Sequence, residues 1–79
     1  MQPYQAVSCE LHSQYELYIM RAHPVIVSYR DQHGRTQSLQ AKAIDLVTQQ
    51  GAEWLRLKTD AGECDIRLDQ IILCKPAST

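Results

Sequence analysis

The stretch 39–47 constrains the fold of this chain more than any other. Its first residues alternate apolar and polar side chains, which is the pattern of a β-strand with one buried face. The alternation then slips, because Asp45 stands where an inward residue is due and Leu46 follows it. A phase slip within one strand indicates a bulge or a sharp bend. We therefore expect one long, strongly bent strand; the alternative is a short strand that ends at Ile44 and runs into a turn.

A helix is expected before this strand. From Ser8 to Ala22 apolar residues recur at the spacing of an amphipathic helix. Ser8 is a suitable N-cap, and His23-Pro24 ends the helix, since a residue before proline avoids the α region. Short alternating segments bounded by turn residues predict the other strands. The expected elements are a helix over about 9–21, strands over about 24–30, 35–46, 53–59, 63–69 and 71–74, and a polar loop over 48–51.

These elements predict a mainly β (α+β) fold in one domain that spans residues 1–79. One helix followed by about five bent antiparallel strands is typical of an Sm-like small β-barrel, with the N-terminal α-helix capping one end. In this fold Cys64, Ile66 and Leu68 face inward, and Cys64 belongs to the core. An OB-type barrel is the near alternative, but it places its helix between the third and fourth strands, where residues 59–63 leave no room for one.

Charge and cysteine content argue against several classes of protein. The chain has 8 basic and 9 acidic residues and a net charge of −1, whereas a domain that holds nucleic acid by its own electrostatics shows a basic stripe. Three cysteines cannot all pair within one chain, so we expect reduced thiols and a bacterial-type cytoplasmic protein. No apolar run reaches membrane-spanning length and no signal peptide is recognised, so we expect no membrane association.

No catalytic or metal-binding pattern is complete. Cys9 and His12 have the C-x-x-H spacing of half a zinc site, but no second short-spaced pair completes it. Cys9, Glu10 and His12 supply a nucleophile, an acid and a base close in the chain, yet no glycine-rich oxyanion or phosphate loop accompanies them. We therefore expect no metal, no cofactor and no enzymatic activity.

Two surfaces are candidates for binding. On the helix, Leu17 and Met20 lie opposite the core-facing residues, so they are either buried in a groove or exposed as a docking surface for a partner protein. On the third strand, Trp54 with Arg56 and Lys58 on the same outer face can stack on a base, although such a tryptophan is more often covered by its basic neighbours. An Sm-like RNA-binding module that acts on transcripts directly is therefore the alternative function.

Several short motifs occur in order between about residue 4 and residue 72. They are Tyr4-Gln5, Cys9-Glu10, Glu16-Leu17, Leu39-Gln40-Ala41-Lys42-Ala43, Asp45-Leu46-Val47, Glu53-Trp54-Leu55, Gly62-Glu63 and Arg67-Leu68-Asp69 with Ile71. In these motifs the chain resembles the Rho-binding antiterminator (Rof-like) family. The resemblance implies a small bacterial inhibitor of Rho-dependent transcription termination with an Sm-like fold and an N-terminal helix. It implies binding to the N-terminal RNA-binding domain of the Rho helicase, block of its primary RNA site, and no direct binding of nucleic acid.

The resemblance also implies which residues meet Rho. Because Rho's primary site is basic to hold RNA, an acidic and partly apolar face can compete with the transcript. Glu10 and Glu16 are expected to face basic residues of Rho, while Asp45 is expected to fix the strand bend. We expect the free chain to be a monomer. The expected interface is Glu10, Ser13, Glu16, Leu17, Met20, Lys42, Asp45, Thr48, Gln49 and Gln50. The last three are included because of their position in the predicted fold and not because they match a family motif.

The chain departs from the family pattern just after Cys9, where family members are more acidic. Leu11-His12-Ser13 replaces part of that acidic run, which shifts the expected contact toward apolar side chains. If His12 and His23 charge, the helix side loses most of its negative bias. We therefore expect binding that weakens below about pH 6, where an unperturbed histidine charges.

Overall fold

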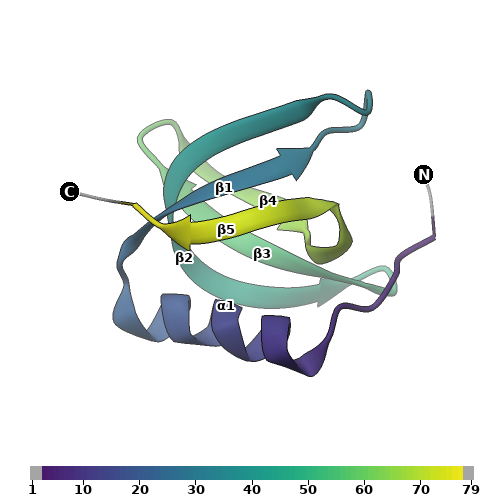
Figure 1. Ribbon diagram of the computed structural model, residues 1–79, viewed down its shortest axis with the longest axis horizontal. Helices are drawn as coiled ribbons and strands as arrows, with labels where there is room; N and C mark the ends of the chain where they lie inside the picture. Colours follow the sequence, from purple (N-terminus) through teal and green to yellow (C-terminus); the bar gives the residue numbers. More distant parts are fainter. Residues whose placement is uncertain (1–2, 78–79) are drawn as a thin grey trace.

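The computed structural model describes residues 3–77 and contains one α-helix and one antiparallel five-stranded sheet. The strands are hydrogen-bonded in the order β4-β3-β2-β1-β5. Figure 1 shows that the sheet curls strongly and that the helix lies along one side of it. Along the chain the elements are α1 (Cys9–Arg21), β1 (Pro24–Arg30), β2 (Thr36–Gln49), β3 (Ala52–Thr59), β4 (Gly62–Arg67), the 3-10 helix η1 (Leu68–Gln70) and β5 (Ile71–Pro76).

The mainly β fold with an N-terminal helix is confirmed, but a closed barrel is not. Within residues 3–77, β4 pairs only with β3 and β5 pairs only with β1. A barrel closes only when the strands at the two ends of the sheet pair with each other. The curled sheet is therefore open between β4 and β5, which are its two edges.

The bend in β2 lies where the sequence predicts it. The register between β2 and β3 shifts between Ala43 and Asp45, so Ile44 is the extra residue of a bulge. The alternative of a short strand that ends at Ile44 is wrong, because β2 continues to Gln49. The Asp45 carboxylate accepts a 2.8 Å hydrogen bond from the Leu46 backbone N–H, directly beside the bulge. Through this bend β2 pairs with β1 along its first half and with β3 along its second half, as can be followed in Figure 1.

The connection between β2 and β3 is tighter than the expected polar loop over 48–51. Thr48 and Gln49 still belong to β2 and pair with β3, and only Gln50 and Gly51 form the turn. Gln50 has a φ of 53° and Gly51 a φ of 74°. Two consecutive left-handed residues are what a two-residue type I′ hairpin turn requires, because its twist matches that of the flanking strands.

Two expectations for the fourth strand are wrong. β4 ends at Arg67 rather than at residue 69, because η1 begins at Leu68 and turns the Asp69 carboxylate back onto the Arg67 guanidinium. Cys64 is exposed, although the alternation places it on the inner face with Ile66. Within residues 3–77 no strand pairs with the outer edge of β4, so its first residues border solvent.

Both ends of α1 have well-formed caps. The Ser8 hydroxyl accepts a 3.2 Å hydrogen bond from the Leu11 backbone N–H, as the sequence predicts. Ala22 has a left-handed φ of 54°, and its N–H bonds back to the carbonyls of the last turn. α1 and β1 cover the expected ranges 9–21 and 24–30, while β2 and β5 run past their expected ends at residues 46 and 74.

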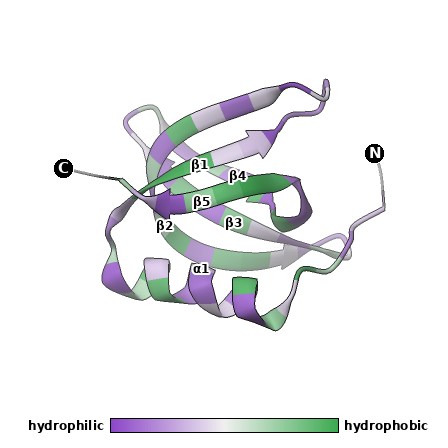
Figure 2. Ribbon diagram, viewed as in Figure 1, coloured by the Kyte–Doolittle hydropathy of each residue, from purple (hydrophilic) through white to green (hydrophobic). Residues whose placement is uncertain are grey.

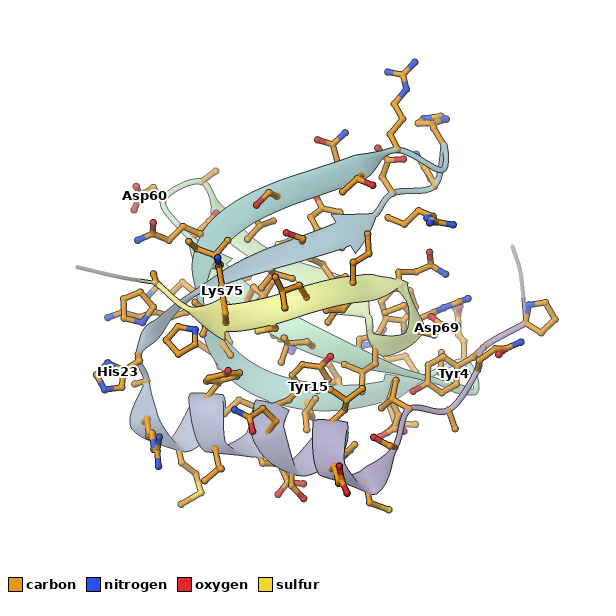
Figure 3. The ribbon with its side chains drawn as sticks, in the orientation of Figure 1. Tyr4, Tyr15, His23, Asp60, Asp69 and Lys75 are labelled. Carbon is orange, nitrogen blue, oxygen red and sulfur yellow. The ribbon has the colours of Figure 1, made fainter. Side chains whose placement is uncertain are left out.

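The core lies between α1 and the inner face of the curled sheet. From α1 it receives Tyr15 and Tyr18, and Figure 3 shows Tyr15 pointing from the helix toward the strands. Figure 2 shows hydrophobic and hydrophilic residues interspersed along α1. The sheet and η1 contribute the buried residues Val25, Val27, Ala41, Ala43, Leu55, Leu57, Ile66 and Leu68.

Candidate partner-binding surface

The outer face of α1 presents two exposed apolar side chains next to acids. Glu10, Ser13, Leu17 and Met20 follow one another at steps of three, four and three residues, so they share one helical face. We call these four residues the helix face. It points away from the core, and 41% of Leu17 and 79% of Met20 are exposed. The alternative in which the helix is buried on both sides is therefore wrong.

His12 connects α1 to the sheet beside this face. Its Nδ1 atom lies 2.9 Å from Oε1 of Glu16, and its Nε2 atom lies 2.8 Å from Oε2 of Glu53 on β3. Glu53 pairs across the hairpin with Thr48 of β2. The exposed residues 48–50, which we call the hairpin end, are therefore held near the first half of α1. Figure 1 shows the β2–β3 turn and the start of α1 at the same end of the molecule.

The two contacts of His12 require a proton on each ring nitrogen, because a carboxylate can only accept hydrogen bonds. In its charged form the imidazolium donates to Glu16 and to Glu53 at once. The bond to Glu53 contributes most to raising the pKa of His12 above its usual value; partial burial opposes the rise, and the bond to Glu16 adds to it. The pH range in which His12 charges is therefore displaced upward from the range that we expected from the sequence.

The segment before α1 is tied to the same part of the sheet. The Tyr4 hydroxyl donates a 3.4 Å hydrogen bond to Oε1 of Glu53, and its ring lies 5.8 Å from the Arg67 guanidinium carbon. Arg67 donates two hydrogen bonds, of 2.6 and 2.9 Å, to Asp69, which also accepts one of 2.9 Å from the Gln5 backbone N–H. Figure 3 shows Tyr4 and Asp69 at the same end of the molecule. The motif residues at both ends of the chain thus form one polar network.

The carboxyl group of Asp69 is nearly buried in this network, since only 8% of its side chain is exposed. Burial acts to raise the pKa of Asp69, but the hydrogen bonds from the Arg67 side chain and the Gln5 backbone outweigh it and lower the pKa below its usual value. Asp69 therefore stays ionised and holds both Arg67 and the N-terminal segment in place.

Lys42 and Asp45 lie apart from the helix face. Both are exposed on β2, where Lys42 pairs with Lys58 and Asp45 pairs with Arg56. Within residues 3–77, no hydrogen bond or ion pair joins either side chain to α1. The contact that Asp45 does make, to the backbone N–H beside the bulge, supports the expected role in the strand bend.

Side chains on the outer face of β3, which the sequence offers for stacking RNA bases, make contacts within the sheet. Trp54 is only partly exposed, and its indole Nε1–H donates a 3.4 Å hydrogen bond to the Gln49 carbonyl. Arg56 donates two hydrogen bonds, of 2.9 and 3.1 Å, to Asp65 on β4. Trp54 and Arg56 therefore already make hydrogen bonds within the sheet, and within residues 3–77 only Lys58 of the three residues makes none of these. This weakens the RNA-binding alternative.

The part of the chain that the structure describes contains no group of three or more His, Cys, Asp or Glu residues placed to hold a metal ion. No helix within residues 3–77 is both long enough and apolar enough to cross a membrane.

Sequence reasoning missed His12 and Glu53 as the pair that ties the surface together. The spacing of His12 and Glu16 by four residues on one helix is a signal for their contact. The contact between His12 and Glu53 spans 41 residues along the chain, and it follows only from how α1 packs on the sheet.

These features define a small, curled β-sheet domain with an exposed helix face and an exposed hairpin end. A family model described as "Modulator of Rho-dependent transcription termination (ROF)" matches residues 6–79. The chain belongs to this family, so the resemblance seen in its motifs is confirmed. The family is regulatory, its process is Rho-dependent termination of transcription, and Rho is the partner that this process implies.

One solved structure illustrates the fold. The proteasome accessory factor B/C (PafBC) of Arthrobacter aurescens is similar with a TM-score of 0.77 and 16% sequence identity, over 95% of this chain and 13% of that chain. The likeness at this identity shows the fold alone, and it covers a small part of a much longer protein. No curated protein matches the chain.

Proposed function

We propose that this protein inhibits Rho-dependent transcription termination by binding the N-terminal RNA-binding domain of Rho and covering its primary RNA site. The observation that carries the proposal is the exposed pair Leu17 and Met20 on the helix face, with Glu10 on the same face and Glu16 beside it. A site that holds RNA is basic, so an acidic competitor is attracted to it. Apolar contacts then add affinity that does not depend on charge.

The proposed interface has an apolar centre and a polar rim, which is the usual anatomy of a protein–protein contact. Leu17 and Met20 form the centre. Glu10, Ser13 and Glu16 surround it on α1, and the hairpin end, residues 48–50, extends it toward the sheet. Asp45 contributes through the bulge that bends β2 back toward α1, while Lys42 belongs to the proposed interface through its family motif.

We further propose an Sm-like architecture, a monomeric free state and a cytoplasmic location. The bent five-stranded sheet with its N-terminal helix supports the first, in a form that is open between β4 and β5. A core built entirely from one chain supports the second. Transcription termination takes place in the bacterial cytoplasm, where the free thiols of Cys9, Cys64 and Cys74 stay reduced.

A termination assay in vitro tests this function. Transcription through a Rho-dependent terminator is run with purified Rho and increasing amounts of the chain, and a template with an intrinsic terminator serves as control. We expect more read-through at the Rho-dependent terminator and none at the intrinsic one. Unchanged read-through, together with direct and salt-dependent binding of this chain to RNA, would establish the RNA-binding alternative instead.

A further inference from the structure

We propose that His12 is a positioning residue that makes the helix face and the hairpin end act as one surface, and that its protonation sets the affinity for the partner. The inference rests on the proposed function. Its basis is the geometry of the bridge, in which one imidazolium spans two carboxylates on two different elements, at 2.9 Å to Glu16 and 2.8 Å to Glu53. We expect tight binding while His12 is charged and weaker binding when it is neutral.

Both acidic groups that contact His12 favour its charged form. Glu16 faces it from α1, and Glu53 faces it from β3. From the N-terminal segment, the Tyr4 hydroxyl donates to the other carboxylate oxygen of Glu53. Beyond Tyr4 lie Arg67 and Asp69, which pair with each other through two hydrogen bonds. The bridge thus contains two acids and one histidine, and within residues 3–77 no Lys or Arg forms an ion pair with either acid.

Loss of the proton removes one of the two hydrogen bonds, because a neutral imidazole has a single N–H. One carboxylate then faces a nitrogen lone pair, and the two glutamates repel each other without a cation between them. Since the pKa of His12 is raised in the folded chain, the bridge is fully formed below the usual histidine pKa of about 6.5 and is lost as the pH rises through the higher folded value. The polar contact between the first half of α1 and the β2–β3 hairpin is then weakened, while Tyr15 and Tyr18 still pack α1 on the sheet.

The expected effect of His12 deprotonation on the affinity is opposite to the effect that charge alone predicts. Deprotonation of His12 makes the chain more negative, which by charge alone strengthens attraction to a basic partner. A weaker contact between His12 and Glu53 lets the helix face and the hairpin end shift relative to each other, which lowers the affinity for the partner. We expect positioning to dominate, so affinity falls as the pH rises, in contrast to the weakening below pH 6 that the sequence suggests.

The test measures affinity for purified Rho at pH 6.5 and pH 8.5 by fluorescence anisotropy of the labelled full chain. The wild type should bind about two- to fivefold more weakly at the higher pH, the range expected for one partly exposed ion pair. His12→Gln, which carries no positive charge between the two acids at any pH and does not titrate, should be weak at both and lose this dependence. His23→Gln, at the other end of α1, is the matched control and should behave as wild type. Titratable groups of Rho affect the affinity of all three chains alike, so they do not account for a difference in pH dependence between them.

A second readout is the pKa of His12 in the free chain, followed by NMR of the imidazole ring. Glu53→Gln should lower it toward the usual histidine value, since the bond to Glu53 is the largest cause of the rise. A complex whose affinity is constant or increases from pH 6.5 to 8.5, or a His12→Gln chain with the wild-type profile, overturns the inference and leaves the proposed function standing. No complex with Rho at either pH overturns the proposed function itself.

Discussion

Replacing Leu17 and Met20 together by alanine tests the apolar centre of the proposed interface. Fully burying a Leu or Met side chain stabilises by about 1.5–3 kcal/mol. The free chain leaves 41% of Leu17 and 79% of Met20 exposed, and only this exposed part remains to be buried on binding. Scaling the transfer free energy by these fractions gives about 2–3.5 kcal/mol for the pair. The double variant should therefore bind Rho roughly 30- to 300-fold more weakly.

The variant should keep its fold but lose some stability. The part of each side chain that is already buried in the free chain, which is the larger part of Leu17, is lost as well, so the same scaling gives a decrease in unfolding free energy of about 1–2.5 kcal/mol. The matched control is Ile72→Thr with Leu73→Thr, which removes two exposed apolar side chains from β5, with 54% and 50% exposed. This control should bind Rho normally.

Isothermal titration calorimetry with Rho gives the affinity of each variant, and thermal unfolding of each free chain gives its stability. The reasoning is refuted if the alanine variant is folded and binds as tightly as wild type. It is also refuted if the β5 control loses as much affinity as the helix variant, since the apolar contact then lies elsewhere on the molecule.

Three further predictions concern the network, the turn and the bulge. Because the folded pKa of Asp69 is lowered, its contribution to stability is present above the usual Asp pKa of about 3.9 and is lost as the pH falls through the folded value. Thermal unfolding between pH 6 and pH 2 should show Asp69→Asn less stable than wild type at pH 6, with the difference in Tm closing in acid. A difference in Tm that does not depend on pH contradicts this. Gln50→Asn should raise Tm by a few degrees, roughly 0.5–1 kcal/mol, because asparagine tolerates the left-handed conformation at φ 53° better than glutamine; a lower Tm argues against a type I′ turn. Asp45→Ala should lower the unfolding free energy in urea by about 0.5–1.5 kcal/mol, while Asp45→Asn, which keeps an acceptor for the Leu46 N–H, recovers most of it; equal stability of all three chains removes Asp45 from the account of the bulge.

Local features of this fold are readable from the sequence. Ser8 and His23-Pro24 mark the ends of α1, and the phase slip before Leu46 marks the bulge in β2, because capping, proline geometry and side-chain alternation act over a few residues. Alternation alone misplaces Cys64, since it gives the face of a residue but not whether another element covers that face. Alternation also predicts that β4 continues to residue 69, because the apolar and polar residues still alternate there. The structure instead has η1 from Leu68, with Asp69 paired to Arg67.

The candidate surface likewise has some residues that local sequence patterns predict and some contacts that they do not. Leu17 and Met20 follow from helical spacing, and the structure finds them exposed. The bridge from His12 to Glu53 and the bond from Gln5 to Asp69 join residues 41 and 64 positions apart in the chain. Such contacts depend on how α1 and the N-terminal segment lie against the sheet, and no local pattern encodes that placement.

The most direct measurement of the central claim is competition for the RNA site of Rho. A fluorescent pyrimidine-rich RNA is bound to the N-terminal RNA-binding domain of Rho, and this chain is titrated into the complex. The account predicts that the RNA is displaced, that the Leu17→Ala/Met20→Ala variant displaces it only at much higher concentration, and that the chain alone does not bind the RNA. A ternary complex in which RNA and this chain are held together on the domain, or displacement caused by this chain binding the RNA, would contradict it.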